Sequence, residues 1–546
     1  MKSSNILMQS LIENRSRIGE GIYLLYFALM VGARAAGVYE GMTIYNISLV
    51  IGMMLFICKM VVTKHTVKEY AVAAVFLAIA GIVYIHSGEK GLIVCFTMML
   101  GMKEVSEEKV IKVGAVVAGI IIMSKIFLGV FGFVSEIYYP QERDGIGLMF
   151  RHALGYAHPN TLHMNVVMLS MMVMYLVTTR LVAAKSINKV ESHKYHAFVL
   201  IFISVIVFLF NVYIFKYSGS RTGLLASIVY LVVNFWLFIR KKIGIFEKII
   251  SFAAFPIVSF IAIVLPFLLK GDLFDFVNMK IFTTRYSLAM HFWKYNGISL
   301  FGIRLNNPDK GLATYGIDMA QLYLFLQLGL VAFVLIGALT IWFIYQAIKN
   351  DKRAELAVLM GMLFLGMWEP LLYNLGFKNF VYVFMGAMIY ACLNESEKIE
   401  TKNSSISTRM NINNVKSVSE RHINLKSLVL VTTVSIFIGI IVSAIYLGIT
   451  NPPSALYGDK EKNESGKSLG MEAIYLTETE IQQIKENGNL VIGYTDSQTP
   501  MYKYDSVIAN IEYKNRVMSA GVWGGMLAFL VGNGVILIKT RNKSII

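Results

Sequence analysis

Histidine, asparagine and arginine side chains gather in the stretch RHALGYAHPNTLH, residues 151–163, which leads directly into an apolar run of membrane length. An imidazole with an ordinary pKa of about 6.5 can remove a hydroxyl proton near neutral pH. His158 is therefore a candidate general base, and Asn160 could orient a neighbour or bind a sugar hydroxyl. The alternative is an interfacial histidine without a chemical role. Three further histidines compete for the same role: His152, His163 and His291.

Metal chemistry is not favoured by the spacing of these residues. The intervals of six and five residues between His152, His158 and His163 do not place the three rings on one helical face. All three cysteines lie inside apolar runs, with no neighbour at metal-ligand spacing. We expect neither a metal site nor a cofactor, and no disulfide.

Arginines outside the membrane are informative because basic residues concentrate on the cytoplasmic side. Arg221 in SGSRTG lies beside the predicted opening turn of a helix, where unpaired N–H groups and the helix dipole also favour an anion. Arg151 and Arg285 lie near predicted helix starts as well. Three such cations could hold a diphosphate. The alternative for Arg221 is that its side chain reaches the lipid headgroups.

Glu369 lies in the apolar stretch MLFLGMWEPLLYNLGF, immediately before a proline. A carboxylate within a membrane is costly unless it is paired or faces water, so a functional role is the default interpretation. The alternative is a structural ion pair with an arginine of the core.

The elements that position these residues are transmembrane helices. The chain has 546 residues, is 56% hydrophobic and has a mean hydropathy of +0.61, which is typical of a polytopic membrane protein. A span needs roughly 20 apolar residues, and about fourteen candidates are found. We predict an all-α fold with about twelve core transmembrane helices and two further C-terminal ones. The candidates begin near Gly21, Met42, Tyr70, Gly91, Val110, His158, Tyr195, Thr222, Ile249, Gln321, Leu356, Phe377, Leu428 and Ala520.

The formal net charge of +16 follows the membrane pattern. Lysine and arginine cluster after every second predicted span, so both termini are expected in the cytoplasm. This distribution makes nucleic acid a poor candidate partner, and the lipid bilayer the expected environment.

The predicted organisation has three parts. Residues 1–393 form the transmembrane core, with outer loops at about 135–158 and 270–320. The larger loop should contain short helices, because apolar residues recur there at helical spacing. Residues 394–427 are predicted to form a flexible cytoplasmic linker. Residues 428–546 form a two-helix module with an outer segment at about 450–519.

These motifs, taken together, resemble the Wzy-type polysaccharide polymerases of bacterial capsule and O-antigen assembly, within the O-antigen polymerase and ligase superfamily. The resemblance covers about Gly21 to Leu393. The motifs that carry it are R..LGYAHPN at 151–160, SGSRTG at 218–223, Arg285 with Trp293, the LFG ending at Gly302, D..QLY.FLQLG at 318–329, and Glu369 with Asn374.

The resemblance implies a metal-independent glycosyltransferase at the outer face of the bacterial cytoplasmic membrane. A glycan on undecaprenyl diphosphate would be transferred onto a hydroxyl of a lipid-linked repeat unit. A flippase and a chain-length regulator would be the protein partners. The implied roles extend the candidate residues: the three arginines clamp diphosphate, His158 or His291 accepts the proton, and the substrate-binding set includes Arg151, Asn160, Asp318, Trp293 and Glu369.

Two other functions remain open at the level of sequence. A ligase of the same superfamily would transfer a finished glycan to another acceptor, and sequence does not separate it from a polymerase. A lipid-linked oligosaccharide flippase also has twelve to fourteen spans, although roughly 50 residues in one outer loop are unusual for a transporter. The C-terminal module could serve in assembly of an export complex.

Overall fold

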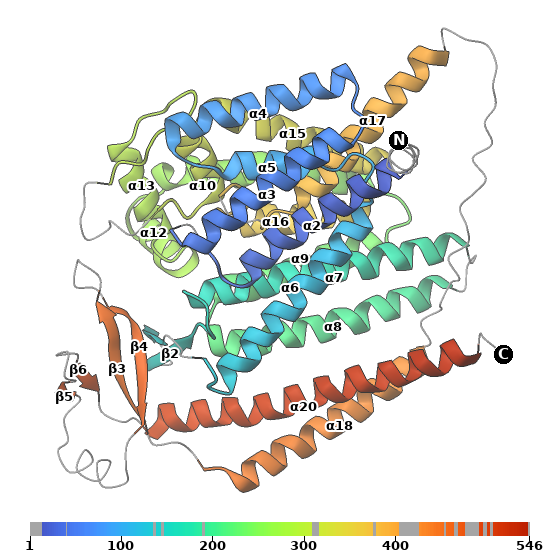
Figure 1. Ribbon diagram of the computed structural model, residues 1–546. Helices are drawn as coiled ribbons and strands as arrows, with labels where there is room; N and C mark the ends of the chain where they lie inside the picture. Colours follow the sequence, from blue (N-terminus) through green and yellow to red (C-terminus); the bar gives the residue numbers. More distant parts are fainter. Residues whose placement is uncertain are drawn as a thin grey trace, which may run out of the picture. The chain divides into compact units, whose positions relative to one another are not determined.

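Apolar helices dominate the computed structural model, as the sequence predicts (Figure 1). Within the described residues, eleven helices are long and apolar enough to cross a membrane, so the protein is a multi-pass helical membrane protein. The described residues are 14–39, 41–134, 138–143, 147–187, 192–307, 316–374, 378–402, 425–451, 455–462, 468–475, 491–494, 500–502 and 506–543. The eleven helices are α2 (Arg15–Ala35), α3 (Thr43–Val62), α4 (Val67–Ser87), α6 (Glu107–Val130), α7 (Pro159–Ile187), α8 (Ser192–Ser218), α9 (Arg221–Ile239), α10 (Ile245–Ile263), α15 (Leu330–Lys349), α18 (Leu425–Ile449) and α20 (Ser506–Lys543).

Three of the predicted spans are short or interrupted helices. They are α5 (Gly91–Leu100), α16 (Arg353–Leu365) and α17 (Val381–Lys402), whose apolar part ends at Leu393. Nearly every residue of α5 and α16 is buried, so these helices pack inside the bundle. A Cβ on Gly386 of α17 would lie 2.1 Å from the backbone oxygen of Met99 in α5. Glycine therefore permits the two helices to pack backbone against backbone.

Several helix starts follow from local sequence. Thr66 and Glu69 form a reciprocal capping box at the start of α4. Pro159 occupies the first position of α7, as expected for a residue that lacks an N–H. The Ser220 side chain caps α9 by accepting a hydrogen bond from the N–H of Gly223.

A six-stranded antiparallel sheet departs from the all-α prediction. Its order is β2-β1-β4-β3-β6-β5. The strands lie in two segments that the sequence treats as outer loops, where short alternating patterns give a weak signal. The strands are β1 (Tyr138–Arg143), β2 (Gly147–His152), β3 (Ala455–Lys462), β4 (Ser468–Tyr475), β5 (Val491–Tyr494) and β6 (Pro500–Tyr502).

The chain groups into two compact units. The first contains residues 1–122, 163–212 and 220–405, and the second contains residues 123–162, 213–219 and 406–546. The second unit therefore joins the C-terminal module to the first outer loop and to the last turns of α8. In the predicted linker, α17 continues to Lys402 and α18 begins at Leu425, while residues 403–424 lie outside the described part.

The predicted short helices of the larger loop are present in the first unit. They are α11 (Leu265–Leu268), α12 (Gly271–Phe276), the π-helix η1 (Val277–Ile281) and α13 (Arg285–Tyr295). The chain re-enters the bundle through α14 (Ala320–Leu322) and the π-helix η3 (Tyr323–Gln327), and the short 3-10 helix η4 (Pro370–Leu372) follows α16.

Candidate functional site

Arg285 begins α13 and faces the protein interior. Its Nε donates to the backbone oxygen of Trp368 at 2.7 Å, and its Nη1 donates to that of Phe282 at 3.3 Å. The indole N–H of Trp368 in turn donates to the backbone oxygen of Ile281 at 3.1 Å. These reciprocal bonds join the first turn of α13 to the segment that follows α16.

Two carboxylates flank the Arg285 guanidinium. Asp318 lies 3.5 Å from Nε and Glu369 lies 3.7 Å from Nη2. The structure thus brings together three of the residues that the sequence selects. Glu369 precedes η4 rather than lying within a helix, and its ion pair with an arginine is the structural alternative named above.

The environment of Asp318 disfavours its charged form. Burial raises the pKa of the Asp318 carboxyl above its ordinary value, and the positive charge of Arg285 opposes that rise. Arg285 directs its two shortest hydrogen bonds to backbone oxygens, while both carboxylates lie at longer distances. An incoming anion could therefore displace a carboxylate without breaking the hydrogen bonds that orient Arg285.

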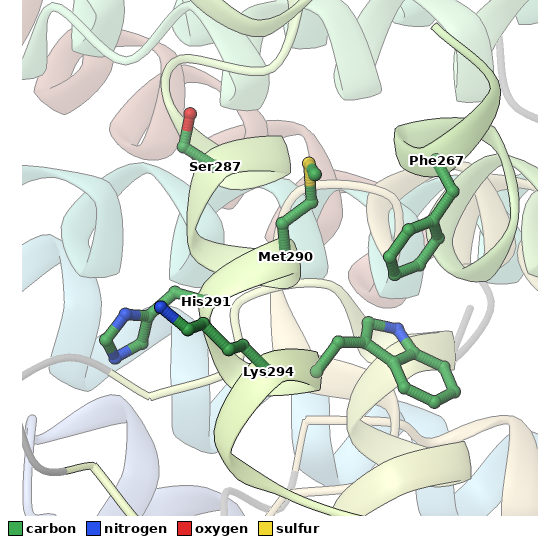
Figure 2. Close-up of a pocket in the computed structure, with 6 residues that line it drawn as sticks. Phe267, Ser287, Met290, His291 and Lys294 are labelled. Carbon is green, nitrogen blue, oxygen red and sulfur yellow. The ribbon is translucent and has the colours of Figure 1, made fainter.

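An open cavity of about 490 Å³ lies along another face of α13 (Figure 2). Lys294 lies nine residues after Arg285, which at about 100° per residue is half a turn around the helix. Arg285 therefore anchors one face of α13, and the cavity opens on the other. The lining residues are Phe267, Ser287, Met290, His291, Trp293 and Lys294.

The cavity combines aromatic walls with polar groups, which is the usual composition of small-molecule sites. Trp293 contacts Phe267 edge to face at 5.8 Å and Phe325 at 5.7 Å between ring centroids. The Trp293 Nε1 is buried and has no hydrogen-bond partner among the described residues. His291 and Lys294 project from neighbouring positions of α13 (Figure 2).

The two candidate bases differ in their hydrogen bonds. His291 Nε2 lies 3.0 Å from Asn307 Oδ1, so a proton on Nε2 is donated to Asn307 and Nδ1 becomes the basic nitrogen. His158 Nδ1 already accepts the backbone N–H of Asn160 at 3.1 Å, which places the proton of the neutral ring on Nε2. His158 would have to break that bond to act as a base. The hydrogen bonding favours His291.

Arg151 lies in the second unit, on β2. Its Nε donates to the backbone oxygen of Ser218 at 2.7 Å, and its Nη2 donates to Asn160 Oδ1 at 2.6 Å. Ser218 ends α8, so the cation binds at the negative end of a helix dipole. Asn160 therefore orients an arginine, one of the two roles proposed for it from the sequence.

Arg221 is exposed at the first position of α9, and the described residues give it no ion pair. The SGSRTG motif has a packing explanation as well. A Cβ on Gly223 would lie 2.5 Å from the imidazole of His163, which is completely buried. His163 is therefore a core residue packed against that motif.

Asn307, Lys294 and the backbone oxygen of Trp368 were missed by the sequence reasoning. Lys294 lies three residues after His291 on a predicted helix, so helical spacing could have paired the two. Asn307 comes from an irregular segment, and a backbone oxygen carries no sequence signal. No spacing rule predicts either contact.

The fold and these sites define a multi-pass helical membrane protein with polar clusters outside its candidate spans. In comparisons with known proteins, no family model, no curated protein and no solved structure matches the chain. The function is therefore argued from the residues themselves.

Proposed function

We propose that the protein is a glycosyltransferase that polymerises lipid-linked repeat units at the outer face of a bacterial cytoplasmic membrane. The observation that carries the proposal is the construction of α13. One helix outside the candidate spans has an arginine fixed by backbone oxygens at its start and an aromatic cavity with an oriented histidine along another face. Such a helix carries both a cation for an anionic leaving group and a base for an acceptor hydroxyl.

The acceptor sugar would occupy the cavity. Apolar sugar faces stack on aromatic rings, and Trp293 provides such a ring beside an N–H that has no partner in the described part of the chain. His291 Nδ1 would take the proton of the acceptor hydroxyl as that oxygen attacks the anomeric carbon of the donor. The bond between that carbon and the diphosphate oxygen breaks, and the undecaprenyl diphosphate leaves.

The leaving diphosphate would be stabilised by arginine. Arg285 retains capacity for further hydrogen bonds, because a guanidinium has five N–H donors and its two bonds to backbone oxygens use two of them. Arg221 is exposed at a helix N-terminus, where the dipole also favours an anion. Asp318 and Glu369 would balance the charge of Arg285 before the donor binds.

The test uses purified full-length protein supplied with lipid-linked single repeat units. We expect Arg285→Ala to lower the turnover number at least roughly 100-fold, the effect of removing one donor to a developing anion. We expect His291→Ala to lower it by a similar factor, as for loss of a general base. Arg304→Ala is the matched control, because Arg304 is exposed in the same loop.

The pattern of products separates the alternatives. A ladder of polymer lengths from single repeat units identifies a polymerase, and no ladder with transfer to another acceptor identifies a ligase. A strain lacking the protein that accumulates its lipid-linked units on the inner leaflet would identify a flippase.

Normal turnover of both Arg285→Ala and His291→Ala would reject the α13 site. Normal turnover of His291→Ala alone would return the base role to His158.

A further inference from the structure

Helix α20 of the C-terminal module is hydrogen-bonded to the last turns of α8 within the second unit. Tyr213 Oη and Tyr217 Oη both lie within hydrogen-bond distance of Ser519 Oγ, at 2.9 and 2.6 Å. Tyr217 Oη also donates to the backbone oxygen of Asn515 at 2.9 Å, and Trp523 Nε1 donates to Tyr213 Oη at 3.2 Å. Ser519 is completely buried, so no water competes for these bonds.

One arrangement of hydrogens satisfies the whole network. The Trp523 N–H donates to Tyr213, whose hydroxyl donates to Ser519. The Ser519 and Tyr217 hydroxyls both donate to the backbone oxygen of Asn515, at 2.8 and 2.9 Å, and their oxygens lie 2.6 Å apart. Each group donates once, and the chain ends on a backbone oxygen. Loss of one hydroxyl therefore breaks a connected network rather than an isolated bond.

The same turn of α8 holds Arg151. The residue after Tyr217 is Ser218, whose backbone oxygen accepts the Arg151 Nε–H at 2.7 Å. The Tyr217 ring also meets the ring of His152 edge to face, at 5.3 Å between centroids. Arg151 and its neighbour His152 thus both contact the turn that α20 fixes.

The C-terminal module also extends the hairpin on which Arg151 lies. Strands β1 and β2 pair so that Tyr139 is opposite Arg151. Strand β1 then pairs with β4 through Tyr138 and Met471, which joins the hairpin to β3, β6 and β5 of the module. The module therefore supports Arg151 in two ways. Helix α20 fixes the end of α8, and strand β4 pairs with the hairpin that carries Arg151.

The module itself is held together by close packing of small residues. Helices α18 and α20 run side by side (Figure 1). A Cβ on Gly439 would lie 2.7 Å from the backbone oxygen of Gly521. Ser443 Oγ donates to the backbone oxygen of Val517, and Tyr513 Oη donates to that of Thr450. These contacts join α18 to α20 without involving α8.

We infer that the C-terminal module is part of the Arg151 site and that Tyr217 and Ser519 are positioning residues for Arg151. The module sets where the guanidinium lies by fixing the backbone oxygen of Ser218. That Arg151 also binds the diphosphate of a lipid-linked glycan is the expectation from the sequence, and it rests on the proposed function. The positioning itself does not.

The first experiment measures hydrogen exchange of the full-length protein in lipid nanodiscs. Tyr217→Phe keeps the ring against His152 and removes only the hydroxyl, and Ser519→Ala removes the next hydroxyl of the network. We expect both to speed amide exchange in residues 147–163 roughly two- to tenfold, the range for loss of one or two neutral hydrogen bonds. Tyr513→Phe, the matched control, loses a phenol hydroxyl that binds α18 and should leave that exchange unchanged. Unchanged exchange in Tyr217→Phe and Ser519→Ala overturns the inference.

The second experiment tests whether the effect passes through Arg151. In the polymerisation assay, Ser519→Ala should raise the KM for the lipid-linked donor with a smaller change in kcat. The same substitution should have no further effect in an Arg151→Gln background, because coupled groups are not additive. Additive effects would mean that α20 acts through general stability, and would overturn the positioning role. Tyr217→Phe and Ser519→Ala could speed exchange in residues 147–163 while Arg151→Gln leaves the donor KM unchanged. That pair of results would support the positioning role and reject donor binding by Arg151.

Discussion

At the residue scale, Asp318 competes with any anion for Arg285. Because burial raises its pKa, Asp318 becomes protonated at higher pH than an ordinary aspartate, and its loss of charge leaves Arg285 more available. We expect the KM for the lipid-linked donor to fall as pH falls through the raised pKa of Asp318. Asp318→Asn should keep a low KM over that range and lose this pH dependence. The measurement is the donor KM against pH, with the exposed Asp272→Asn as control.

The raised pKa of Asp318 also predicts how the free energy of unfolding changes with pH. A carboxyl whose pKa is raised on folding contributes stability that is fully present below its unfolded pKa and is lost as pH rises through the folded pKa. Asp318→Asn should therefore not lower the unfolding temperature at neutral pH. A higher donor KM in Asp318→Asn would show instead that the carboxylate arranges Arg285 for binding.

Residue chemistry was more predictable than residue partners. Arg285, Asp318 and Glu369 were each selected from the sequence, but their meeting depends on a loop that returns over many residues. The choice between His158 and His291 required the hydrogen bonds of Asn160 and Asn307, which no spacing predicts. Residue type gives the chemistry, and long-range folding selects which residues can use it.

At the element scale, two motif glycines close the large loop. Gly302 and Gly329 have φ values of 87° and 92°, and a Cβ on Gly329 would lie 2.2 Å from the Gly302 nitrogen. Ile303 N–H donates to the backbone oxygen of Gln327, and Leu330 N–H donates to that of Ser299. The chain that follows α13 is thereby fixed at the entrance to α15.

We predict that Gly329→Ala destabilises the protein by at least about 1 kcal/mol from the left-handed backbone alone, with a further cost from the overlap. Thermal unfolding in detergent should show a lower midpoint, and donor turnover should fall because α13 loses its support. Gly297→Ala is the matched control in the same loop, since nothing lies within 4 Å of a Cβ there. Equal unfolding midpoints for the two variants would contradict this account of the motif.

Elements were predictable where they are long and apolar. The eleven long helices follow from hydropathy, whereas the sheet depends on pairing between segments more than 300 residues apart. A strand such as β1, YYPQER, has no strict alternation and contains a proline. Local pattern could not have shown that it pairs with the C-terminal module.

At the scale of the whole molecule, the number of crossings decides the orientation. Eleven crossings would place the termini on opposite sides, yet basic residues at Arg15 and Arg541 favour the same side. Both termini can lie in the cytoplasm, as the basic residues predict, only when an odd number of the short helices α5, α16 and α17 also cross.

Short helix α5 has polar contacts on both sides of it in the sequence. At one end, Lys59 at the end of α3 donates to the backbone oxygen of Lys103, just after α5, at 2.7 Å. At the other, Glu89 just before α5 accepts hydrogen bonds from Tyr323 and Gln327 at 2.7 and 2.6 Å. Polar contacts therefore lie beyond both ends of α5, and its ten residues alone cover only about 15 Å.

Helix α16 also has polar contacts on both sides of it. Lys352 at its start forms ion pairs with Glu107, which begins α6, and with Glu355. Its far end leads to Trp368, whose backbone oxygen binds Arg285. Helix α16 therefore connects the ion pairs of Lys352 to the segment that holds Arg285.

We therefore predict fourteen crossings with both termini in the cytoplasm, because α17 must then return the chain to the basic side. A cysteine-free protein with a single cysteine at the exposed positions Gly316 or Lys241 tests this in intact cells. Gly316→Cys should react with a membrane-impermeant maleimide, Lys241→Cys should react only after permeabilisation, and a fluorescent protein fused after Ile546 should fold and fluoresce inside. A dark fusion in a protein whose Gly316→Cys is labelled in intact cells would show that one of the short helices does not cross.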